Sequence, residues 1–286
     1  MKLYAPSTIK EIKNQYNFRL SKSLGQNFLT DKHIIDRIIE GSRIGPEDLV
    51  IEIGPGIGVL TAEAAENAKR VVAVEIDNGL IPILEDTLKE YDNITILNQD
   101  VLKTDFSTIV SAYKTEGKTK IIGNLPYYIT TPILAALLES RAFESITVMV
   151  QKEVAQRIAA PAGKGDYGAF SVFCQYYAVP ELLFDVPPSC FIPQPKVTSA
   201  VLKLTMRTEP VCEIRDEALF FRTVKAAFAQ RRKTLLNALS AGFGELSKAE
   251  LAELIEESGF APTVRGETLD IPSFASLANA IAERKS

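Results

Sequence analysis

The chain has 286 residues, 46% of them hydrophobic, which is enough for one large domain or two unequal ones with a real core. Its formal net charge of −4 is unusual for a nucleic-acid-binding protein, so such binding would have to depend on local clusters of Lys and Arg. One histidine, three widely spaced cysteines and no long apolar run argue against a hydrolytic triad, a disulfide framework, a metal site, a secretory signal and a membrane span. We expect a cytoplasmic protein with reduced cysteines.

Strands and helices alternate over about the first 150 residues. Short buried apolar runs predict strands at 49–53, 70–75, 94–98, 119–123 and 145–150. The segments around them predict helices at 31–41, 57–67, 79–90 and 131–139. This alternation is typical of a parallel α/β sheet, and His33, beside an apolar helical stretch, is expected to be structural or exposed.

A glycine turn follows the first of these strands, with Gly54, Gly56 and Gly58 spaced as G-x-G-x-G. The dinucleotide-binding fingerprint has the different spacing G-x-G-x-x-G. Glu52 lies two residues before the turn, and no Lys or Arg occurs between it and Lys69. The turn therefore suits a cationic ligand better than a pyrophosphate.

Three more polar residues, Glu75, Asp100 and Asn124, lie at the ends of successive predicted strands, which meet at one edge of a parallel sheet. Glu75, about 20 residues after the turn, can hold two ribose hydroxyls. Asp100 can accept a hydrogen bond from an adenine amino group. Such acids are usually just solvated, but together the positions predict an adenosyl ligand with a positive centre. S-adenosylmethionine, whose sulfonium is cationic, fits that description.

The segment Asn124-Leu125-Pro126-Tyr127 follows the strand at 119–123. The Asn124 side-chain oxygen and the Leu125 carbonyl can each accept one N–H from the exocyclic amine of a planar base. Pro126 fixes the turn and has no N–H to compete, while Tyr127 offers a ring for stacking. An ordinary strand-to-loop turn with a core tyrosine is the alternative, and the glycine turn upstream favours the base-binding interpretation.

The end of the predicted sheet differs from a dinucleotide-binding domain. Runs at 179–186 and 197–206 predict two strands joined by a proline-rich loop, 187–196, and strands without a helix between them should pair antiparallel. The composition shifts near 208–210, and helical patterns follow at 216–240, 247–257 and 272–284. We predict a methyltransferase domain at 1–208, with an N-terminal arm at 1–29, and a helical domain at 209–286.

The densest cluster of cations lies in the predicted helix 216–240. Residues 220–240 hold five cations and no acid: Arg222, Lys225, Arg231, Arg232 and Lys233. Most charge runs are solvated helix faces, but the lack of any acid here favours contact with phosphates. We predict that these residues bind RNA and that the helical domain recognises it.

Five segments together resemble the ribosomal RNA adenine N6-dimethyltransferase family, most closely its bacterial small-subunit branch: 23–29, 52–58, 124–127, 187–191 and 227–235. The resemblance extends from about residue 20 to about residue 282. It implies a Rossmann-like class I methyltransferase fold with a mostly parallel sheet and an antiparallel final hairpin. It also implies transfer of methyl groups from S-adenosylmethionine to N6 of two adjacent adenosines in the 3′-terminal hairpin of 16S ribosomal RNA, giving N6,N6-dimethyladenosines during small-subunit biogenesis.

The resemblance adds roles that the residues alone do not reveal. It implies that Asn27 and the backbone of Leu29 cover the cofactor, where the bare sequence indicates only the turn before a helix. It implies that Phe191 contacts the target base from the side opposite Tyr127. Asn124 can also touch the methionine end of the cofactor.

Three other functions remain as alternatives. One is the branch that methylates large-subunit RNA and confers macrolide resistance, although its helical tail is less elaborate and 264–270 looks like the small-subunit branch. A DNA adenine methyltransferase would have Asn-Pro-Pro-Tyr, and Leu125 argues against it. The third is a noncatalytic ribosome-assembly factor, against which the full set of predicted site residues argues. We expect a monomer, since no large apolar stripe is evident.

Overall fold

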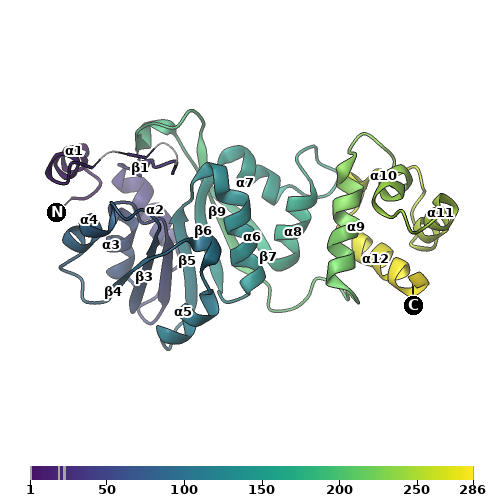
Figure 1. Cartoon of the computed structure of the whole chain (residues 1–286), viewed down its shortest axis with the longest axis horizontal. Helices are drawn as coiled ribbons and strands as arrows, with labels where there is room; N and C mark the ends of the chain where they lie inside the picture. The colour runs from purple at the N-terminus through teal and green to yellow at the C-terminus, as the bar shows by residue number, and fades with distance from the viewer. Residues whose placement is uncertain (1, 19, 22–23, 286) are drawn as a thin grey trace. The chain divides into compact units, whose positions relative to one another are not determined.

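The computed structural model describes residues 2–18, 20, 21 and 24–285 (Figure 1). The chain forms two compact units, Met1–Ala155 with Val179–Met206, and Gln156–Ala178 with Arg207–Ser286. The second stretch of the helical unit begins near the predicted boundary at 208. The segment 156–178, which the sequence analysis placed in the first domain, belongs to the second unit because its Tyr167 and Val172 pack into that unit's core.

The first unit is built on a seven-stranded sheet in the order β4-β3-β2-β5-β6-β9-β7. Its strands are β2 (Leu49–Ile53), β3 (Arg70–Glu75), β4 (Ile94–Asn98), β5 (Thr119–Asn124), β6 (Ser145–Gln151), β7 (Ala178–Val186) and β9 (Ser199–Met206). Neighbours from β4 to β6 are parallel, and β9 runs antiparallel to β6. The predicted fold class, with its antiparallel ending, is confirmed.

The chain changes direction across the sheet at β2, because β3 pairs with one side of β2 and β5 with the other. A cleft forms at such a switch point, just beyond the carboxyl ends of the strands. The glycine turn follows β2, and Asn124 ends β5, so both lie at this switch point.

Helices complete the first unit: α1 (Pro6–Gln15), α2 (Lys32–Ser42), α3 (Val59–Ala65), α4 (Ile81–Thr87), α5 (Phe106–Ala112) and α6 (Thr130–Ser140). Helix α7 (Lys152–Ala159) begins in the first unit and ends in the second, because the first unit ends at Ala155 in this stretch. The sequence analysis did not predict α1, α5 or α7. A second, two-stranded sheet pairs β1 (Phe28–Leu29) with β8 (Phe191–Ile192) antiparallel. This pairing fastens the N-terminal arm to the proline-rich loop.

The second unit is helical: α8 (Ala169–Tyr177), α9 (Glu217–Ala229), α10 (Leu235–Gly242), α11 (Lys248–Glu257) and α12 (Ile271–Lys285). The single helix predicted at 216–240 is in fact two helices. The chain leaves the helical conformation at Gln230, and the Thr234 side chain caps α10 by accepting from the Asn237 backbone N–H. Among the described helices, none is long and apolar enough to cross a membrane.

Candidate active site

The glycine turn after β2 depends on backbone that other residues rarely adopt. Gly54, Gly56 and Gly58 have φ of 68°, 61° and 91°. A Cβ built on Gly56 would lie 3.0 Å from the Phe28 ring, so the arm passes directly over the turn. A Cβ on Gly54 would have no protein atom within 4 Å. The space beside Gly54 belongs to a pocket that opens at this edge of the sheet.

The pocket brings together most of the residues that the sequence analysis proposed. It is lined by predicted site residues from the arm, the glycine turn and three strand ends: Asn27, Leu29, Gly54, Gly56, Glu75, Asp100, Asn124 and Pro126. Three residues predicted to be catalytic, Leu125, Tyr127 and Phe191, are not among its lining residues. The role assigned to the Leu125 carbonyl stays a prediction.

Two buried acids flank the pocket. Glu52 is 1% exposed, its Oε2 accepts from Thr61 Oγ1 at 2.5 Å, and burial raises its pKa to about 8. Burial raises the pKa of Glu75 to about 7, although its Oε1 accepts from the Asp77 backbone N–H at 2.8 Å. A ligand that brings hydrogen-bond donors or a positive charge to either carboxyl would favour the ionised form.

Asp100 lies just beyond β4, at the side of the pocket opposite Asn124 in strand order. Its Oδ1 accepts from the Leu102 backbone N–H at 3.0 Å, which fixes the side chain. Its Oδ2 lies 3.9 Å from Lys103 Nζ, and the side chain is 28% exposed. One carboxylate oxygen thus remains accessible to a ligand.

Asn124 has a defined orientation. Its Nδ2 donates to the Asn27 carbonyl at 2.8 Å, so Oδ1 is the free end of the amide, with no partner in the described part of the chain. The Leu125 N–H donates to the Met149 carbonyl at 3.1 Å, and no described residue donates to the Leu125 carbonyl. Two acceptors are therefore left free immediately after β5.

The two tyrosines after Pro126 differ in environment. Tyr127 is half-buried, with its hydroxyl 2.5 Å from Ser199 Oγ, and burial raises its pKa. Tyr128 is 58% exposed and lines the pocket. The sequence analysis singled out Tyr127 and missed Tyr128. The doubled tyrosine after Pro126 was the available signal.

Phe191 lies in the core of the first unit. It is 1% exposed and is paired with Leu29 in the β1–β8 ladder. In this conformation, contact with a base would require its side chain to move, and the contact with the target base opposite Tyr127 stays a prediction. The ladder that buries it is formed by residues far apart in the sequence.

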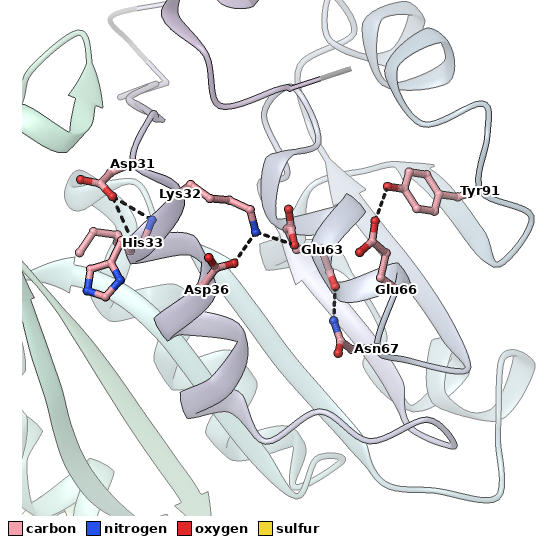
Figure 2. A network of polar contacts seen from close by, with 9 residues as sticks. Asp31, Lys32, His33, Asp36, Glu63, Glu66, Asn67 and Tyr91 are labelled. Atoms are coloured by element: carbon pink, nitrogen blue, oxygen red, sulfur yellow. Dashed lines mark hydrogen bonds and ion pairs between the residues drawn. The ribbon is translucent and has the colours of Figure 1, made fainter.

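Helix α2 is anchored at the point where the arm ends (Figure 2). Asp31 caps the helix by accepting from the backbone N–H groups of His33 at 3.0 Å and Ile34 at 3.3 Å. Lys32 pairs with Asp36 on the same helix and with Glu63 of α3 at 3.1 Å, and the hydrogen bond to Asp36 raises the pKa of Lys32. These contacts hold α2 against α3 and so fix the arm beside the glycine turn. His33 is exposed, as predicted.

The predicted RNA-binding cations divide into two groups. Arg222 is engaged: it contacts Glu245 at 2.7 and 3.0 Å and lies 4.3 Å from the centre of the Phe243 ring. Arg231 is engaged as well, because it donates to the carbonyls of Gly165 at 2.6 Å and Tyr167 at 3.1 Å.

The other three cations, Lys225, Arg232 and Lys233, are exposed. Their side chains form no hydrogen bond or ion pair with the rest of the described chain. Arg232 and Lys233 lie in the turn between α9 and α10 rather than on a helix face. These three are the cations available to a partner.

Metal-ligand clusters and paired cysteines are both absent from the part of the chain that the structure describes. No group of three or more His, Cys, Asp or Glu residues there could hold a metal ion. Cys174, Cys190 and Cys212 are all free.

The chain matches the family described as ribosomal RNA adenine dimethylase over residues 17–283. It is 52% identical over 286 residues to a ribosomal RNA small subunit methyltransferase A of Alkaliphilus metalliredigens, covering 99% of both chains. It is 49% identical over 281 residues to the protein of the same name from Clostridioides difficile, covering 98% of this chain and 97% of that one.

Two solved structures share the fold. A dimethyladenosine transferase from Plasmodium falciparum has a TM-score of 0.76 and 24% identity, and the match covers 90% of this chain and 98% of that one. The 23S rRNA methyltransferase ErmE has a TM-score of 0.67 and 26% identity, with coverage of 89% and 99%.

Proposed function

Because the chain belongs to the ribosomal RNA adenine dimethylase family, we propose that it transfers methyl groups from S-adenosylmethionine to N6 of two adjacent adenosines in the 3′-terminal hairpin of 16S ribosomal RNA. The observation that supports this proposal is the pair of free acceptors after β5: Asn124 Oδ1, from a residue that lines the pocket, and the Leu125 carbonyl, next to it in the chain. Identity of about half the residues over nearly the full length to relatives named small subunit methyltransferase A supports the small subunit as the substrate.

The residues of the pocket fit S-adenosylmethionine. When bound, this cofactor supplies a methyl group on a positively charged sulfur. The missing Cβ of Gly54 leaves open space that a side chain would fill. Glu75 would accept from two ribose hydroxyls, and the accessible oxygen of Asp100 would accept from the adenine amino group. Asn27 and the Leu29 backbone would cover the ligand from the arm.

Asn124 and Leu125 would act on the target amine by positioning it. The lone pair of adenine N6 is conjugated into the ring, which makes the nitrogen a poor nucleophile. Asn124 Oδ1 and the Leu125 carbonyl would each accept a hydrogen bond from one of the two N6–H groups. These two hydrogen bonds favour tetrahedral character at the nitrogen and free its lone pair. Pro126 has no N–H that could compete for either acceptor. Catalysis would come mainly from orientation and electrostatics.

No strong base is required before methyl transfer, because the alkylated ammonium is acidic and loses a proton afterwards. This fits the lack of any histidine other than the exposed His33. After the first transfer N6 keeps only one N–H, so one acceptor loses its partner. The pocket must then hold the methylated base by stacking, for which we propose Tyr127 and, after movement of its side chain, Phe191.

RNA selection is proposed to involve the helical unit. Lys225, Arg232 and Lys233 are exposed and free of acidic partners among the described residues, which suits contact with phosphates. Arg222 and Arg231, also predicted to bind RNA, are engaged within their own unit and would contribute mainly by holding its shape.

The test is transfer of radiolabelled methyl groups to isolated small and large subunits from a strain that lacks the enzyme. We expect label on small subunits alone, at N6,N6-dimethyladenosine after digestion of the RNA. Label on large subunits would support the macrolide-resistance type instead. Tight binding to small subunits without any transfer would support a noncatalytic assembly factor.

We also propose that the protein acts as a cytoplasmic monomer. Ribosomal RNA in bacteria is a cytoplasmic substrate, and the three cysteines are unpaired. Light scattering after size-exclusion chromatography should give a mass near 31.4 kDa. A mass twice as large would contradict the monomer.

A further inference from the structure

An exposed aromatic ring stands at the mouth of the pocket without an assigned role. Tyr128 is 58% exposed, more than any other large apolar or aromatic side chain that the structure shows as exposed. It follows the half-buried Tyr127 in the short 3₁₀ turn Tyr127–Ile129, directly after the two proposed acceptors. Its hydroxyl forms no hydrogen bond with the rest of the described chain, so no internal contact explains the exposure.

One side of the Tyr128 ring faces the arm. A Cβ built on Gly25 would lie 3.5 Å from both Cδ1 and Cε1 of Tyr128, and 3.6 Å from the Pro126 Cβ. Gly25 has a φ of 62°, a conformation that favours glycine. The arm backbone at Gly25 therefore lies beside the ring, with room for a methyl group between them, while more than half of the side chain stays accessible.

We infer that Tyr128 binds the RNA by stacking on the nucleotide next to the target adenosine. The target base has to reach Asn124 Oδ1 and the Leu125 carbonyl, so it occupies the pocket just beyond β5. Tyr128 lines the same pocket and is largely exposed, so a nucleotide beside the bound base can reach its ring. Every base has a face that can stack on an aromatic ring.

This inference rests on the proposed function, and it adds a consequence for a substrate with two adjacent adenosines. While one adenosine is in the pocket, its neighbour would rest on Tyr128. The Tyr128 ring would then keep the two adjacent adenosines in position relative to the pocket. Loss of the ring should weaken capture of the RNA more than binding of the cofactor, whose main proposed hydrogen-bond acceptors are Glu75 and Asp100.

The first experiment compares Tyr128→Ala, Tyr128→Leu and Tyr128→Phe in steady-state methylation of small subunits. We expect kcat/KM to fall about 5- to 150-fold for the Ala and Leu variants, the range that base–aromatic stacking gives. The Phe variant should stay within about twofold, since it keeps the ring. The Kd for S-adenosylmethionine should change less than kcat/KM for the subunit in the Ala and Leu variants, because Tyr128 is only one of the residues that line the cofactor pocket. Val179→Ala, an exposed apolar site on β7, is the surface control.

The second experiment identifies the base. Small subunits are reconstituted with 16S RNA whose ligated 3′ segment carries an abasic nucleotide beside the target. If Tyr128 stacks on that base, Tyr128→Ala and the abasic site together cost no more than either alone. The inference would be overturned if the losses in kcat/KM caused by Tyr128→Ala and by the abasic site multiplied when combined. An unchanged kcat/KM in Tyr128→Ala would overturn it as well. Failure of the unaltered protein to methylate small subunits would instead contradict the proposed function.

Discussion

At the scale of single residues, the orientation of one amide decides what the site can do. Asn124 donates through Nδ2 to the Asn27 carbonyl, which leaves Oδ1 as its free atom. The reversed amide would present donors to a substrate amine that is itself a donor. The arm therefore contributes to the chemistry by selecting the acceptor end of the Asn124 side chain.

Replacement of Asn124 by Ala should reduce methyl transfer far more than RNA binding. The missing acceptor acts on the reacting amine, and removal of one such preorganised group costs about 100- to 1000-fold in kcat. Single-turnover rates at saturating S-adenosylmethionine measure the effect. The Asn124→Asp variant keeps an acceptor but loses the donor to Asn27, so its rate of methyl transfer should fall less than that of Asn124→Ala. Near-normal turnover of the Ala variant would remove Asn124 from the mechanism.

Cofactor affinity should depend on the ionisation of Glu75. Burial raises its pKa to about 7, and the ionised form is the better acceptor for ribose hydroxyls. Affinity for S-adenosylmethionine should therefore weaken as the pH falls from about 8 to about 6. Glu75→Gln should remove this step and weaken binding about 10- to 100-fold, as expected for hydrogen bonds to a charged group. Calorimetry across this pH range is the measurement.

The neighbouring acid provides the control for that pH profile. Glu52 has a pKa raised to about 8 and titrates close to the same range. Glu52→Gln should leave the step caused by Glu75 in place. A profile that is unchanged in Glu75→Gln but flattened in Glu52→Gln would assign the pH dependence to Glu52 instead.

Strand-end positions were predictable from the sequence, whereas the exposure of side chains was not. Glu75, Asp100 and Asn124 line one pocket because parallel strands end at a common edge. The hydroxyl of Tyr127 has its partner in Ser199, 72 residues further along the chain. Phe191 is buried by its pairing with Leu29. Such contacts depend on tertiary neighbours and leave no local pattern.

At the scale of elements, most strands of the first unit were predictable, whereas several helices and the break after α9 were not. Buried apolar runs revealed β2, β3, β5 and β6 because these strands lie inside the sheet and are covered on both faces, while the edge strand β4 is only partly buried. Length does not explain the missed helices, because α1 has ten residues and was not predicted, whereas α3 and α4 have seven residues each and were. Residues 230–234 are all polar and interrupt the apolar pattern, and both this break and the cap at Thr234 were overlooked.

The break between α9 and α10 leads to different roles for adjacent cations. Replacing both Arg232 and Lys233 with Gln should leave the melting temperature unchanged and weaken binding to small subunits. The slope of log K against log salt should flatten by about 0.7–0.9 for each phosphate that the protein no longer neutralises. An unchanged slope in the folded double variant would show that these two side chains are only solvated.

Arg231→Gln is the matched variant in the same turn. It should lower stability, by about 1 kcal/mol, because the carbonyls of Gly165 and Tyr167 lose their shared donor while remaining partly accessible to water. Its effect on the salt slope should be smaller than that of the double variant. Thermal melting followed by circular dichroism separates the two behaviours.

At the scale of the whole molecule, the second unit is assembled from two separate stretches of chain. Residues 156–178 belong to the second unit, although β7 and β9, which follow them in the chain, belong to the sheet of the first unit. Composition marked the later boundary near 208 but not the earlier one. Within the unit, the Tyr167 hydroxyl donates to the Leu269 carbonyl at 3.0 Å, and its ring packs edge-on against Phe228 at 5.7 Å.

Truncation after Thr208 should therefore leave an incomplete protein. It would remove α9 to α12 and expose the apolar surface of 156–178, including Tyr167, which is 1% exposed in the full chain. Exposed apolar surface of this kind binds hydrophobic dyes and promotes aggregation. We expect the truncated chain to bind such a dye and to melt at a lower temperature than the full chain.

A second variant tests whether that instability comes from residues 156–178, which lose their packing partners in the truncated chain. It lacks both 156–178 and 209–286 and joins Ala155 to Val179 through about 12 Gly and Ser residues, which span about 20 Å on average. All the proposed cofactor contacts lie in the retained residues, so this variant should bind S-adenosylmethionine with less dye binding than the simple truncation. If the simple truncation is the better-behaved of the two, residues 156–178 must be stable without α9 to α12, and their place in the second unit's core contributes little to folding.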